Sequence, residues 1–415
     1  MPTEKRIDIE KEKEFKSSLG LNSYLDALFV ADNIITFDVE WVDDKGEKHI
    51  NKGYRVQWNN LNGPYKGGLR FHAGVDVELF KRLAFEQTFK NVLTTLPMGG
   101  AKGGSDFDPH GKSDNEIKNF CEAFMDKLYP YIGEELDIPA GDIGVGSNEI
   151  RYLYERYKLK SLKSDCSLTG KPLDLGGSLC RKEATGYGLC YITAKMLDVI
   201  KGTDFNGKRV VISGSGNVAI YAAEKAMQLG AKVIAMSDSS NSIYVEEGID
   251  LDIVKEIKEV HKGRIKEYPH AVVMNTNDIW SIKCDIALPC ATQNELSLDN
   301  AKVLVANGVI AVAEGANMPC TQEAVEYFLD HDICYLPGKA SNAGGVTVSG
   351  LEIEQNKKKE KWSFEKVDNR LKGIMENIFI NISDTARQDG KGNDFRYGAN
   401  KYAYDKLVEL YEKSK

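Results

Sequence analysis

The N-terminal part of the chain changes from alternating to helical hydrophobic spacing. FDVEWV and GYRVQWNN, between about residues 35 and 62, alternate apolar and polar side chains on either side of the turn-forming DDKGE, which predicts a β-hairpin. Over residues 76–95 apolar side chains recur at spacings of three and four, which predicts an amphipathic helix that ends before Pro97. An S-x-x-E capping box at residue 113 predicts another helix, which extends to about residue 129.

After about residue 175 short β-branched runs alternate with helical stretches. RVVIS, KVIAMSD, CDIALPC and GVIAVAEGA begin at residues 209, 232, 284 and 308, and a helix is predicted over 217–229. This alternation predicts a parallel, doubly wound α/β sheet. A charged segment after Glu352 leads to a long helical pattern from Ser363 and a final amphipathic stretch from about Tyr397. We expect this tail to pack on the first domain.

The composition is that of an ordinary soluble globular protein. The 415 residues are 42% hydrophobic and 28% charged, and 54 Lys and Arg against 62 Asp and Glu leave a formal net charge of −8, which disfavours nucleic acid and anionic membranes as partners. The eight cysteines form no CxxC pair and have no histidine at metal-binding spacing, so we expect reduced thiols and no metal site. The charged N-terminal segment lacks a signal-peptide core, and the longest apolar stretch, 303–313, is too short to span a bilayer. These observations predict a cytoplasmic protein.

A dinucleotide-binding pattern lies in the second half of the chain. A predicted strand is followed by G-x-G-x-x-A at Gly214, Gly216 and Ala219, then by a helix and a second strand. Gly214 permits the tight turn, Gly216 lets a pyrophosphate approach the backbone, and Ala219 keeps the helix close to its strand. Ser215 and Asn217 fall at the helix N-terminus, whose free N–H groups bind phosphate. The alternative is a strand-to-helix turn that only packs.

Asp238 follows this pattern, 24 residues after Gly214. An acidic residue at this position ordinarily accepts a hydrogen bond from the adenosine ribose 2′-hydroxyl, which favours NAD. Neighbouring hydroxyls and a later cationic stretch, which could neutralise a 2′-phosphate, weaken this assignment; these residues are Ser237, Ser239, Ser240, Lys258, His261, Lys262 and Arg264. The alternative for the four cations is a solvent-exposed helix end.

Four segments in the first half carry candidate chemistry: GPYKGGLRFH at 63–72, EQTFKN at 86–91, PMGGAKGG at 97–104 and PAGDIGVG at 139–146. Lys102, with two glycines on each side, is the strongest candidate for an acid or base, because burial and neighbouring lysines lower the proton affinity of an ammonium group. Gln87 and Lys90 share a helix face, which suits carboxylate binding, although a surface lysine is the alternative. Asp142 is a catalytic candidate or a turn residue.

Together these segments resemble, in order and wording, the glutamate dehydrogenase branch of the Glu/Leu/Phe/Val dehydrogenase family. The resemblance extends from about Ile34 to the C-terminus. Further segments carry it: RKEATGYG at 181–188, SGSGNVA at 213–219, ALPCATQNEL at 287–296, EGANMP at 314–319 and SNAGGVTVSGLE at 341–352. It implies a two-domain α/β fold, in which residues 1–175 with about 396–415 bind substrate and oligomerise, and residues 176–395 form a Rossmann-like dinucleotide-binding domain.

The resemblance also implies roles for the matching residues. Lys102 matches the catalytic lysine that activates water, and Asp142 matches the aspartate that exchanges a proton with the substrate amino group. The side-chain carboxylate of glutamate is bound at Lys66 and Ser349. The remaining matches are Gln87, Lys90 and Gly141 at the α-carboxylate end, and Thr185, Asn217 and Asn317 at the nicotinamide half of the cofactor.

The activity implied is reversible NADP-linked oxidative deamination of L-glutamate to 2-oxoglutarate and ammonium. SDSS, which contains Asp238 and Ser239, is similar to the NADP-using bacterial-type enzymes, and NAD is the alternative cofactor. A buried cation at Lys66 independently favours glutamate, because an unpaired ammonium disfavours an apolar substrate side chain. Other amino acid substrates and a catalytically silent nucleotide-binding protein are the alternatives.

The family's usual assembly implies a homohexamer. Two features depart from the family pattern: HAGVDVELF replaces the His-Pro-Ser wording after Arg70, and the N-terminal segment is shorter than expected for helices that contribute to subunit packing. With the lysines present, we interpret His72 and His110 as structural residues.

Overall fold

The computed structural model describes residues 5–163 and 166–415, and the chain divides into two compact units. Unit 1 comprises Met1–Leu179, Val346–Val367 and Ala403–Lys415, and unit 2 comprises Cys180–Gly345 and Asp368–Tyr402. The two-domain α/β class predicted from the sequence is confirmed. The division differs from the predicted boundaries in three places, because residues 176–179 and 346–367 group with unit 1 and residues 396–402 group with unit 2.

Unit 1 contains a five-stranded sheet in the order β1-β2-β4-β3-β5. The strands are β1 (Asn33–Val42), β2 (Lys48–Asn59), β3 (Tyr65–Phe71), β4 (Gly100–Ser105) and β5 (Asp137–Gly141). The predicted hairpin is confirmed as the antiparallel pair β1–β2, and β2 also pairs antiparallel with β4. β3 pairs in parallel with both β4 and β5. The carboxyl ends of β3, β4 and β5 therefore lie at the same edge of the sheet.

The helices of unit 1 before residue 180 begin at caps that the sequence indicates. They are α1 (Ile9–Leu19), α2 (Val77–Leu93), α3 (Asp114–Leu128) and α4 (Ser147–Ser161), with short 3₁₀ turns at Asp26–Phe29, Tyr129–Tyr131 and Leu173–Leu175. Asp76 caps α2, and Ser113 and Glu116 form the predicted capping box of α3. Both predicted helices are confirmed. The aromatic side chains of α3 pack in one buried cluster with Leu69 and Phe71 of β3.

Unit 2 contains a seven-stranded sheet in the order β12-β11-β10-β6-β7-β8-β9. The strands are β6 (Arg209–Ile212), β7 (Lys232–Ser237), β8 (Asn241–Tyr244), β9 (Val272–Asn275), β10 (Ile286–Leu288), β11 (Ala311–Ala313) and β12 (Cys334–Leu336). The first five in this order are parallel, which confirms the doubly wound prediction. β8 and β9 run antiparallel at one edge and were not predicted.

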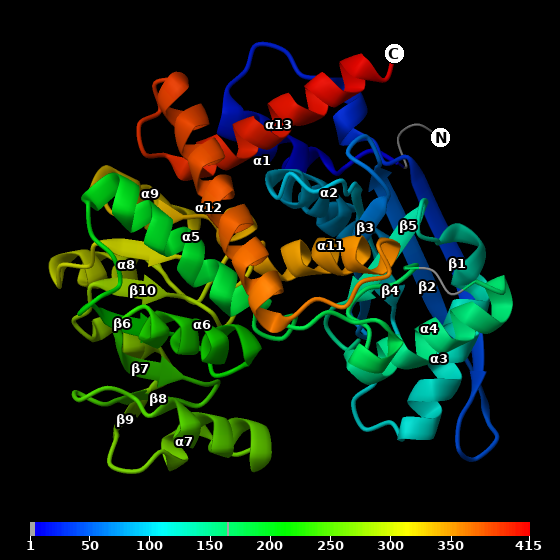
Figure 1. The fold of residues 1–415 in the computed structure, drawn as a ribbon, viewed down its shortest axis with the longest axis horizontal. Coiled ribbons are helices and arrows are strands. Elements are labelled where there is room, and N and C mark those ends of the chain that lie inside the picture. The colour runs from blue at the N-terminus through cyan, green and yellow to red at the C-terminus, as the bar shows by residue number, and fades with distance from the viewer. Residues whose placement is uncertain (1–4, 164–165) are drawn as a thin grey trace. The chain divides into compact units, whose positions relative to one another are not determined.

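Helices cover the sheet of unit 2, as Figure 1 shows. They are α5 (Ala184–Lys201), α6 (Asn217–Gln228), α7 (Leu251–Lys255), α8 (Leu298–Ala306), α9 (Gln322–Asp330) and α10 (Gly338–Ser341), with a π turn at Glu256–Val260 and 3₁₀ turns at Ile265–Glu267 and Thr276–Ser281. α5 and α6 approach closely at Gly186, where a Cβ would lie 2.4 Å from the backbone N of Ala222.

Three further helices have residues in both units. They are α11 (Gly344–Lys357), α12 (Phe364–Gln388) and α13 (Phe395–Lys413). The expected docking of the C-terminal tail on the first domain is seen for residues 403–415, because the Tyr404 hydroxyl accepts a hydrogen bond from the backbone N–H of Leu25 at 2.8 Å.

All eight cysteines are buried and free of disulfide bonds. Burial raises the pKa of the Cys166 thiol to about 11, which keeps it protonated at neutral pH.

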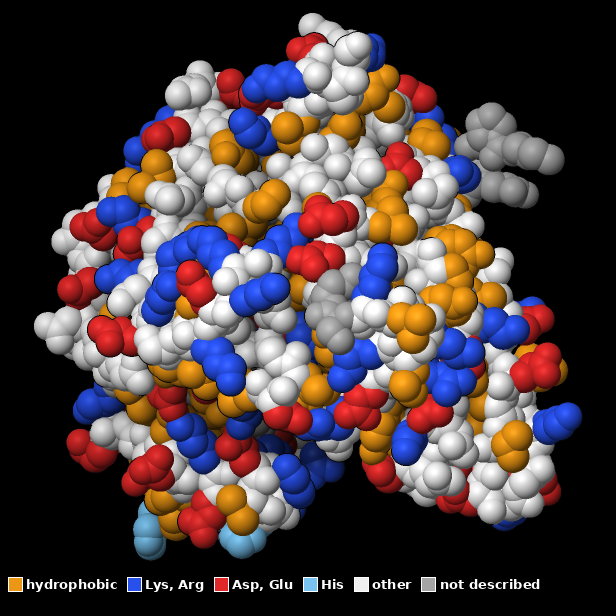
Figure 2. Space-filling view, turned by 45° about the vertical axis from the view of Figure 1, so that its right-hand side comes forward, with side chains coloured by type: hydrophobic (Ala, Val, Ile, Leu, Met, Phe, Trp, Pro, Cys, Tyr) orange, Lys and Arg blue, Asp and Glu red, His pale blue; other side chains and the backbone are white. Residues whose placement is uncertain are grey.

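None of the described helices combines the length and apolar content needed to cross a membrane. On the face shown in Figure 2, acidic and basic side chains are interspersed.

Candidate active site

Asp142 follows the carboxyl end of β5 and lies against two cations. Lys102 Nζ, on β4, is 2.9 Å from Asp142 Oδ2, and Arg70 Nε, on β3, donates a hydrogen bond to the same oxygen at 3.0 Å. The parallel arrangement of β3, β4 and β5 explains this meeting, since it places the ends of the three strands at one edge. The structure thus brings the predicted pair Lys102 and Asp142 into direct contact and adds Arg70, which the sequence analysis did not select.

The two cations keep the Asp142 carboxyl ionised. Burial acts to raise the pKa of this carboxyl, but the charges and hydrogen bonds of Lys102 and Arg70 outweigh burial, so the pKa of Asp142 lies below its usual value. The sequence analysis considered only lysines as the neighbours of Lys102. The structure places a carboxylate beside it instead.

Glycines allow this close approach. A Cβ at Gly68 would lie 2.8 Å from Asp142 Cβ and 3.3 Å from Lys102 Nζ. At Gly141 a Cβ would lie 2.4 Å from the backbone oxygen of Val145, so the turn that carries Asp142 also requires a glycine. A side chain at Gly68 or Gly141 would therefore collide with atoms that already occupy the position of its Cβ.

Helix α2 is hydrogen-bonded to the strand that carries Lys66. Gln87 Nε2 donates to Asn91 Oδ1 at 2.7 Å, and Asn91 Nδ2 donates to the backbone oxygen of Lys66 at 3.1 Å. Lys66 is 1% exposed, and Lys90 is partly buried on the same helix as Gln87, three residues further along. Gln87, one of the residues predicted to bind the α-carboxylate, is thus linked through Asn91 to the backbone of Lys66.

A buried ion pair holds the segment of α11 that carries Ser349. Lys171 Nζ is 2.8 Å from Glu352 Oε1, both side chains are fully buried, and the same carboxylate accepts hydrogen bonds from the backbone N–H groups of Gly170 and Lys171. Glu352 is three residues after Ser349 and so lies on the same side of α11. The Lys171 ammonium group also donates a hydrogen bond to the Cys166 thiol at 3.6 Å.

Two buried hydroxyls occur in the segment before Lys171. The Oγ of Ser167 and the Oγ1 of Thr169 make no hydrogen bond to any described residue, although neither side chain is exposed. Thr169 N donates to the backbone oxygen of Pro139 on β5 at 2.9 Å, which ties this segment to the sheet. The sequence analysis missed both hydroxyls, because no periodic or glycine-rich pattern marks the segment.

The G-x-G-x-x-A turn of unit 2 has two glycines with different requirements. Gly214 has a φ of +87° and donates its backbone N–H to Ser237 Oγ at 2.9 Å, so the turn itself requires glycine. Gly216 has a φ of −87°, and no protein atom lies within 4 Å of the position of its missing Cβ. The protein fold does not require glycine there, whereas a dinucleotide approaching the backbone does. The buried Ala219 lies in the first turn of α6.

A pocket of about 380 Å³ opens at this turn. It is lined by Lys182, Ser215, Gly216, Asn217, Ile220, Lys258, Glu259 and Lys262. The first N–H groups of α6 and three lysines therefore meet in one pocket, which suits a phosphorylated ligand. Lys182 Nζ and Glu259 Oε1 form an ion pair of 2.8 Å at the pocket wall.

Asp238 uses both carboxylate oxygens within the protein. Oδ1 accepts backbone hydrogen bonds from Ser240 and Asn241 at 2.9 and 3.1 Å, and Oδ2 accepts one from Ile265 at 2.8 Å and lies 3.4 Å from Lys258 Nζ. Burial acts to raise the pKa of Asp238, but these hydrogen bonds outweigh it and lower the pKa. This geometry opposes the simple interpretation of Asp238 as a ribose acceptor.

The four cations predicted near Asp238 separate into different environments. Lys258 and Lys262 line the pocket, and Arg264 Nη1 donates to Ser239 Oγ at 2.9 Å. His261 does not line the pocket. It is exposed, and its Nε2 lies 3.4 Å from Glu256 Oε1. Two of the four predicted cations therefore line the pocket, where their positive charges suit a 2′-phosphate better than a ribose hydroxyl.

Thr185 and Asn317 belong to unit 2 but do not line this pocket. Thr185 Oγ1 would be 2.7 Å from a Cβ at Gly345, and Asn317 Oδ1 accepts a hydrogen bond from Asn342 Nδ2 at 2.9 Å. Their assignment to the nicotinamide half remains a prediction.

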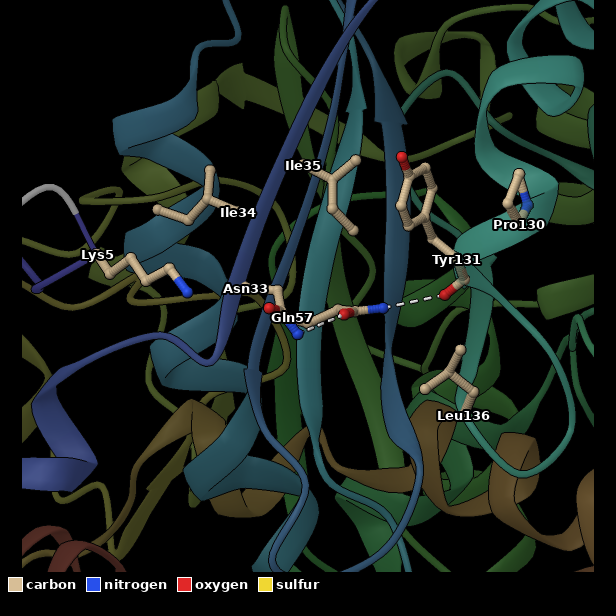
Figure 3. Close-up of a pocket in the computed structure, with 8 residues that line it drawn as sticks. All are labelled: Lys5, Asn33, Ile34, Ile35, Gln57, Pro130, Tyr131 and Leu136. Atoms are coloured by element: carbon tan, nitrogen blue, oxygen red, sulfur yellow. Dashed lines mark hydrogen bonds between the residues drawn. The ribbon is translucent and has the colours of Figure 1, made fainter. Parts of the chain in front are cut away.

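A separate pocket of about 340 Å³ lies beside β1 and β2 of unit 1 (Figure 3). Gln57 Nε2 donates to the backbone oxygen of Tyr131 at 3.0 Å and accepts, through Oε1, a hydrogen bond from Asn33. The same Gln57 amide reaches Asp137, which forms a fully buried ion pair with Arg55. None of the predicted site residues lines this pocket.

The described residues contain one group of potential metal ligands, Asp43, Glu47 and His49. Asp43 already accepts backbone hydrogen bonds from Lys45 and Glu47 and pairs with His49 at 2.9 Å. These contacts account for the group as a structured hairpin turn.

Two family models match the chain. One described as "Glutamate/Leucine/Phenylalanine/Valine dehydrogenase" matches residues 176–414, and one described as "Glu/Leu/Phe/Val dehydrogenase, dimerisation domain" matches residues 31–159. An NAD(P)-specific glutamate dehydrogenase of Xylanibacter ruminicola is 50% identical over 409 residues, which cover 97% of this chain and 91% of that protein. An NADP-specific glutamate dehydrogenase of Helicobacter pylori is 50% identical over 398 residues, which cover 93% and 89%.

A solved structure of Plasmodium falciparum glutamate dehydrogenase matches with a TM-score of 0.95 at 46% identity, covering 98% of this chain and 90% of that chain. The models and relatives account for both units, in agreement with the resemblance predicted from the sequence. The chain therefore belongs to the Glu/Leu/Phe/Val dehydrogenase family.

Proposed function

We propose that this protein is an NADP-linked glutamate dehydrogenase that interconverts L-glutamate with 2-oxoglutarate and ammonium. The observation that carries the proposal is the contact of Lys102 with Asp142 beside a region that contains Lys66 and Gln87. A lysine and an ionised carboxylate in contact provide the two proton-transferring groups that deamination needs. The relatives named glutamate dehydrogenase support the substrate.

Asp142 exchanges a proton with the substrate amino group, and Lys102 activates the water that adds to the iminium carbon. Gln87, Lys90 and Gly141 hold the α-carboxylate. When bound, the nicotinamide cofactor accepts the hydride from the substrate α-carbon in deamination and returns it in amination.

Lys66 and Ser349 bind the side-chain carboxylate. Lys66 is almost completely buried, so the side-chain carboxylate of glutamate would make a charge-assisted contact with its ammonium group that an apolar side chain cannot make. The loss of this contact costs on the order of several kcal/mol, which is enough to reject leucine, valine and phenylalanine.

NADP is the preferred cofactor, with NAD as the alternative. Ser215, Gly216 and Asn217 receive the pyrophosphate at the N-terminus of α6. Ser239, Lys258 and Lys262 bind the 2′-phosphate, and the occupied oxygens of Asp238 support this choice, because an anionic acceptor aimed at the ribose would repel that phosphate. Thr185 and Asn317 contact the nicotinamide half.

The protein assembles as a homohexamer and acts in the cytoplasm. The match of residues 31–159 to a model described as a dimerisation domain supports self-association.

The direct test is the oxidation of NADPH and of NADH with 2-oxoglutarate and ammonium. We expect a rate that requires both substrates and is much higher with NADPH. A preference for NADH would contradict the cofactor assignment and restore Asp238 as a ribose acceptor. Absence of activity with either cofactor, in a sample that binds NADPH, would favour the catalytically silent alternative.

A further inference from the structure

We propose that Arg70 is a positioning residue that holds one oxygen of Asp142 and so reserves the other oxygen for the substrate amino group. The inference rests on the proposed function, because it assigns the proton-transferring role to Asp142. It adds a residue that neither the sequence analysis nor the resemblance assigned.

The geometry separates the two oxygens of Asp142. Arg70 Nε and Lys102 Nζ both contact Oδ2, at 3.0 and 2.9 Å, and no described residue donates a hydrogen bond to Oδ1. The side chains of Arg70 and Asp142 are 17% and 23% exposed, so the pair is neither sealed in the core nor freely solvated. Oδ1 is therefore the oxygen that a bound ammonium group reaches.

The two cations differ in whether they keep their charge. A guanidinium remains protonated at every physiological pH, whereas an ammonium group that acts as an acid or base gives up its proton during the cycle. Arg70 consequently supplies a constant positive charge to Oδ2 when Lys102 becomes neutral. Without Arg70, the carboxylate of Asp142 would lose its only permanent partner among the described residues at that moment.

The proton transfer that this arrangement serves is balanced. In deamination, an N–H bond of the substrate α-ammonium breaks and an O–H bond forms at Asp142 Oδ1. The electron pair stays on nitrogen, where it is needed for the carbon–nitrogen double bond. Asp142 must be ionised to accept the proton, so the rate of deamination falls as the carboxyl becomes protonated at low pH.

Several charged side chains lie on the elements around Asp142. They are Lys66 and Arg70 on β3, Lys102 on β4, Asp137 on β5, Glu149 in the first turn of α4, Glu86 and Lys90 on α2, and His72 directly after β3. Lys102 and Arg70 are the charged groups that contribute most to the lowered pKa of Asp142. Removal of Arg70 therefore raises this pKa, because one of two stabilising cations is lost.

The test compares wild-type enzyme with Arg70→Gln, Arg70→Lys and the control Arg151→Gln. Arg151 lies on α4 in the same unit, where it pairs with the exposed Asp174. We expect Arg70→Gln to lower kcat for glutamate by about 100-fold and to move the acidic limb of the kcat/KM profile upward by about one pH unit. Arg70→Lys should recover part of both effects, and KM for NADP should stay unchanged in all variants.

A loss of activity that is equal at every pH, with the acidic limb in its wild-type position, would overturn the positioning role of Arg70 and leave a structural one.

A second measurement does not need turnover. Asp142→Asn is combined with Arg70→Gln, and the four thermal midpoints form a double-mutant cycle. A coupling of zero would contradict the inference, whereas an inactive wild-type enzyme with strong coupling would contradict only the proposed function.

Discussion

Lys66 and Lys102 are each followed by two glycines, and the second glycine of each pair is required by its neighbours. A Cβ at Gly68 would touch Asp142, and one at Gly104, whose φ is +144°, would lie 1.8 Å from the backbone oxygen of Arg70. A side chain at either position would therefore push apart the groups that meet at Asp142 Oδ2. At the scale of single residues, each K-G-G sequence therefore supplies a lysine cation, and its second glycine leaves room for the neighbouring groups of the site to approach.

Replacement of Lys102 by alanine tests its chemical role. We expect kcat to fall by at least about 100-fold, because a general acid or base is removed, while KM for NADPH remains nearly unchanged. Steady-state kinetics measure both quantities. Lys45→Ala, in the exposed β1–β2 turn, is the matched control. Wild-type turnover in the Lys102 variant would remove this residue from the mechanism.

Two pocket lysines provide a second prediction at this scale. Lys258→Gln and Lys262→Gln should each raise KM for NADPH about tenfold or more, because a charge-assisted hydrogen bond of about 1.5–3 kcal/mol is lost, and should leave KM for NADH almost unaltered. Lys266→Gln is an exposed control in the same segment. Equal effects on both cofactors would place these cations away from the 2′-phosphate.

At the scale of elements, α11 shows what sequence patterns could not predict. The sequence analysis predicted a charged segment after Glu352 and a helical pattern only from Ser363, yet α11 already spans Gly344–Lys357, and its residues from Val346 belong to unit 1. Within unit 1 this helix is held by the buried ion pair between Glu352 and Lys171, which are 181 residues apart in the sequence. Local periodicity contains no information about such a pairing. The short strand β9 was missed for a related reason, since it is largely exposed and has no core-facing pattern.

Breaking this ion pair should loosen α11. Glu352→Gln leaves the Lys171 ammonium buried without its partner, so we expect the free energy of unfolding to fall by about 3–5 kcal/mol in urea titration. KM for glutamate should also rise, because Ser349 lies one turn away.

The double variant Lys171→Met/Glu352→Leu should return most of this stability, since no charge remains buried. Lys357→Gln removes the exposed pair with Glu135 and should cost at most about 1 kcal/mol. Similar losses in the buried and exposed variants would show that the Glu352 pair does not hold the helix.

At the scale of the whole molecule, the sequence predicted the two-domain class and the parallel core of unit 2, because long alternating patterns report directly on burial. It also indicated most side chains of the candidate site through glycine-flanked segments. Arg70 was within reach of the same reasoning, since Lys66, Gly68 and Arg70 alternate along β3 and share a face. The orientation of the Asp238 carboxylate could not be predicted in this way, because its hydrogen-bond donors include the backbone N–H of Ile265, which is 27 residues away in the sequence.

The assembly provides a prediction at this scale. Light scattering coupled to size-exclusion chromatography should give a mass about six times the 46.1 kDa of one chain. A stable monomer would contradict the proposed hexamer.

Gly216 is a position where cofactor binding, and not folding, requires glycine, so a procedure that selects sequences by folding alone would not retain it. Its backbone conformation is open to every L-amino acid, and the space beside it is empty of protein. Alanine there should leave the fold intact, because its methyl group would meet no protein atom and the loss of the favoured N-cap glycine of α6 costs little against the stability of the whole domain. Its methyl group would nevertheless stand where the dinucleotide must approach. A redesign guided only by folding would therefore tolerate Gly216→Ala and weaken cofactor binding, whereas the same redesign would reject a change at Gly214, whose φ is +87°.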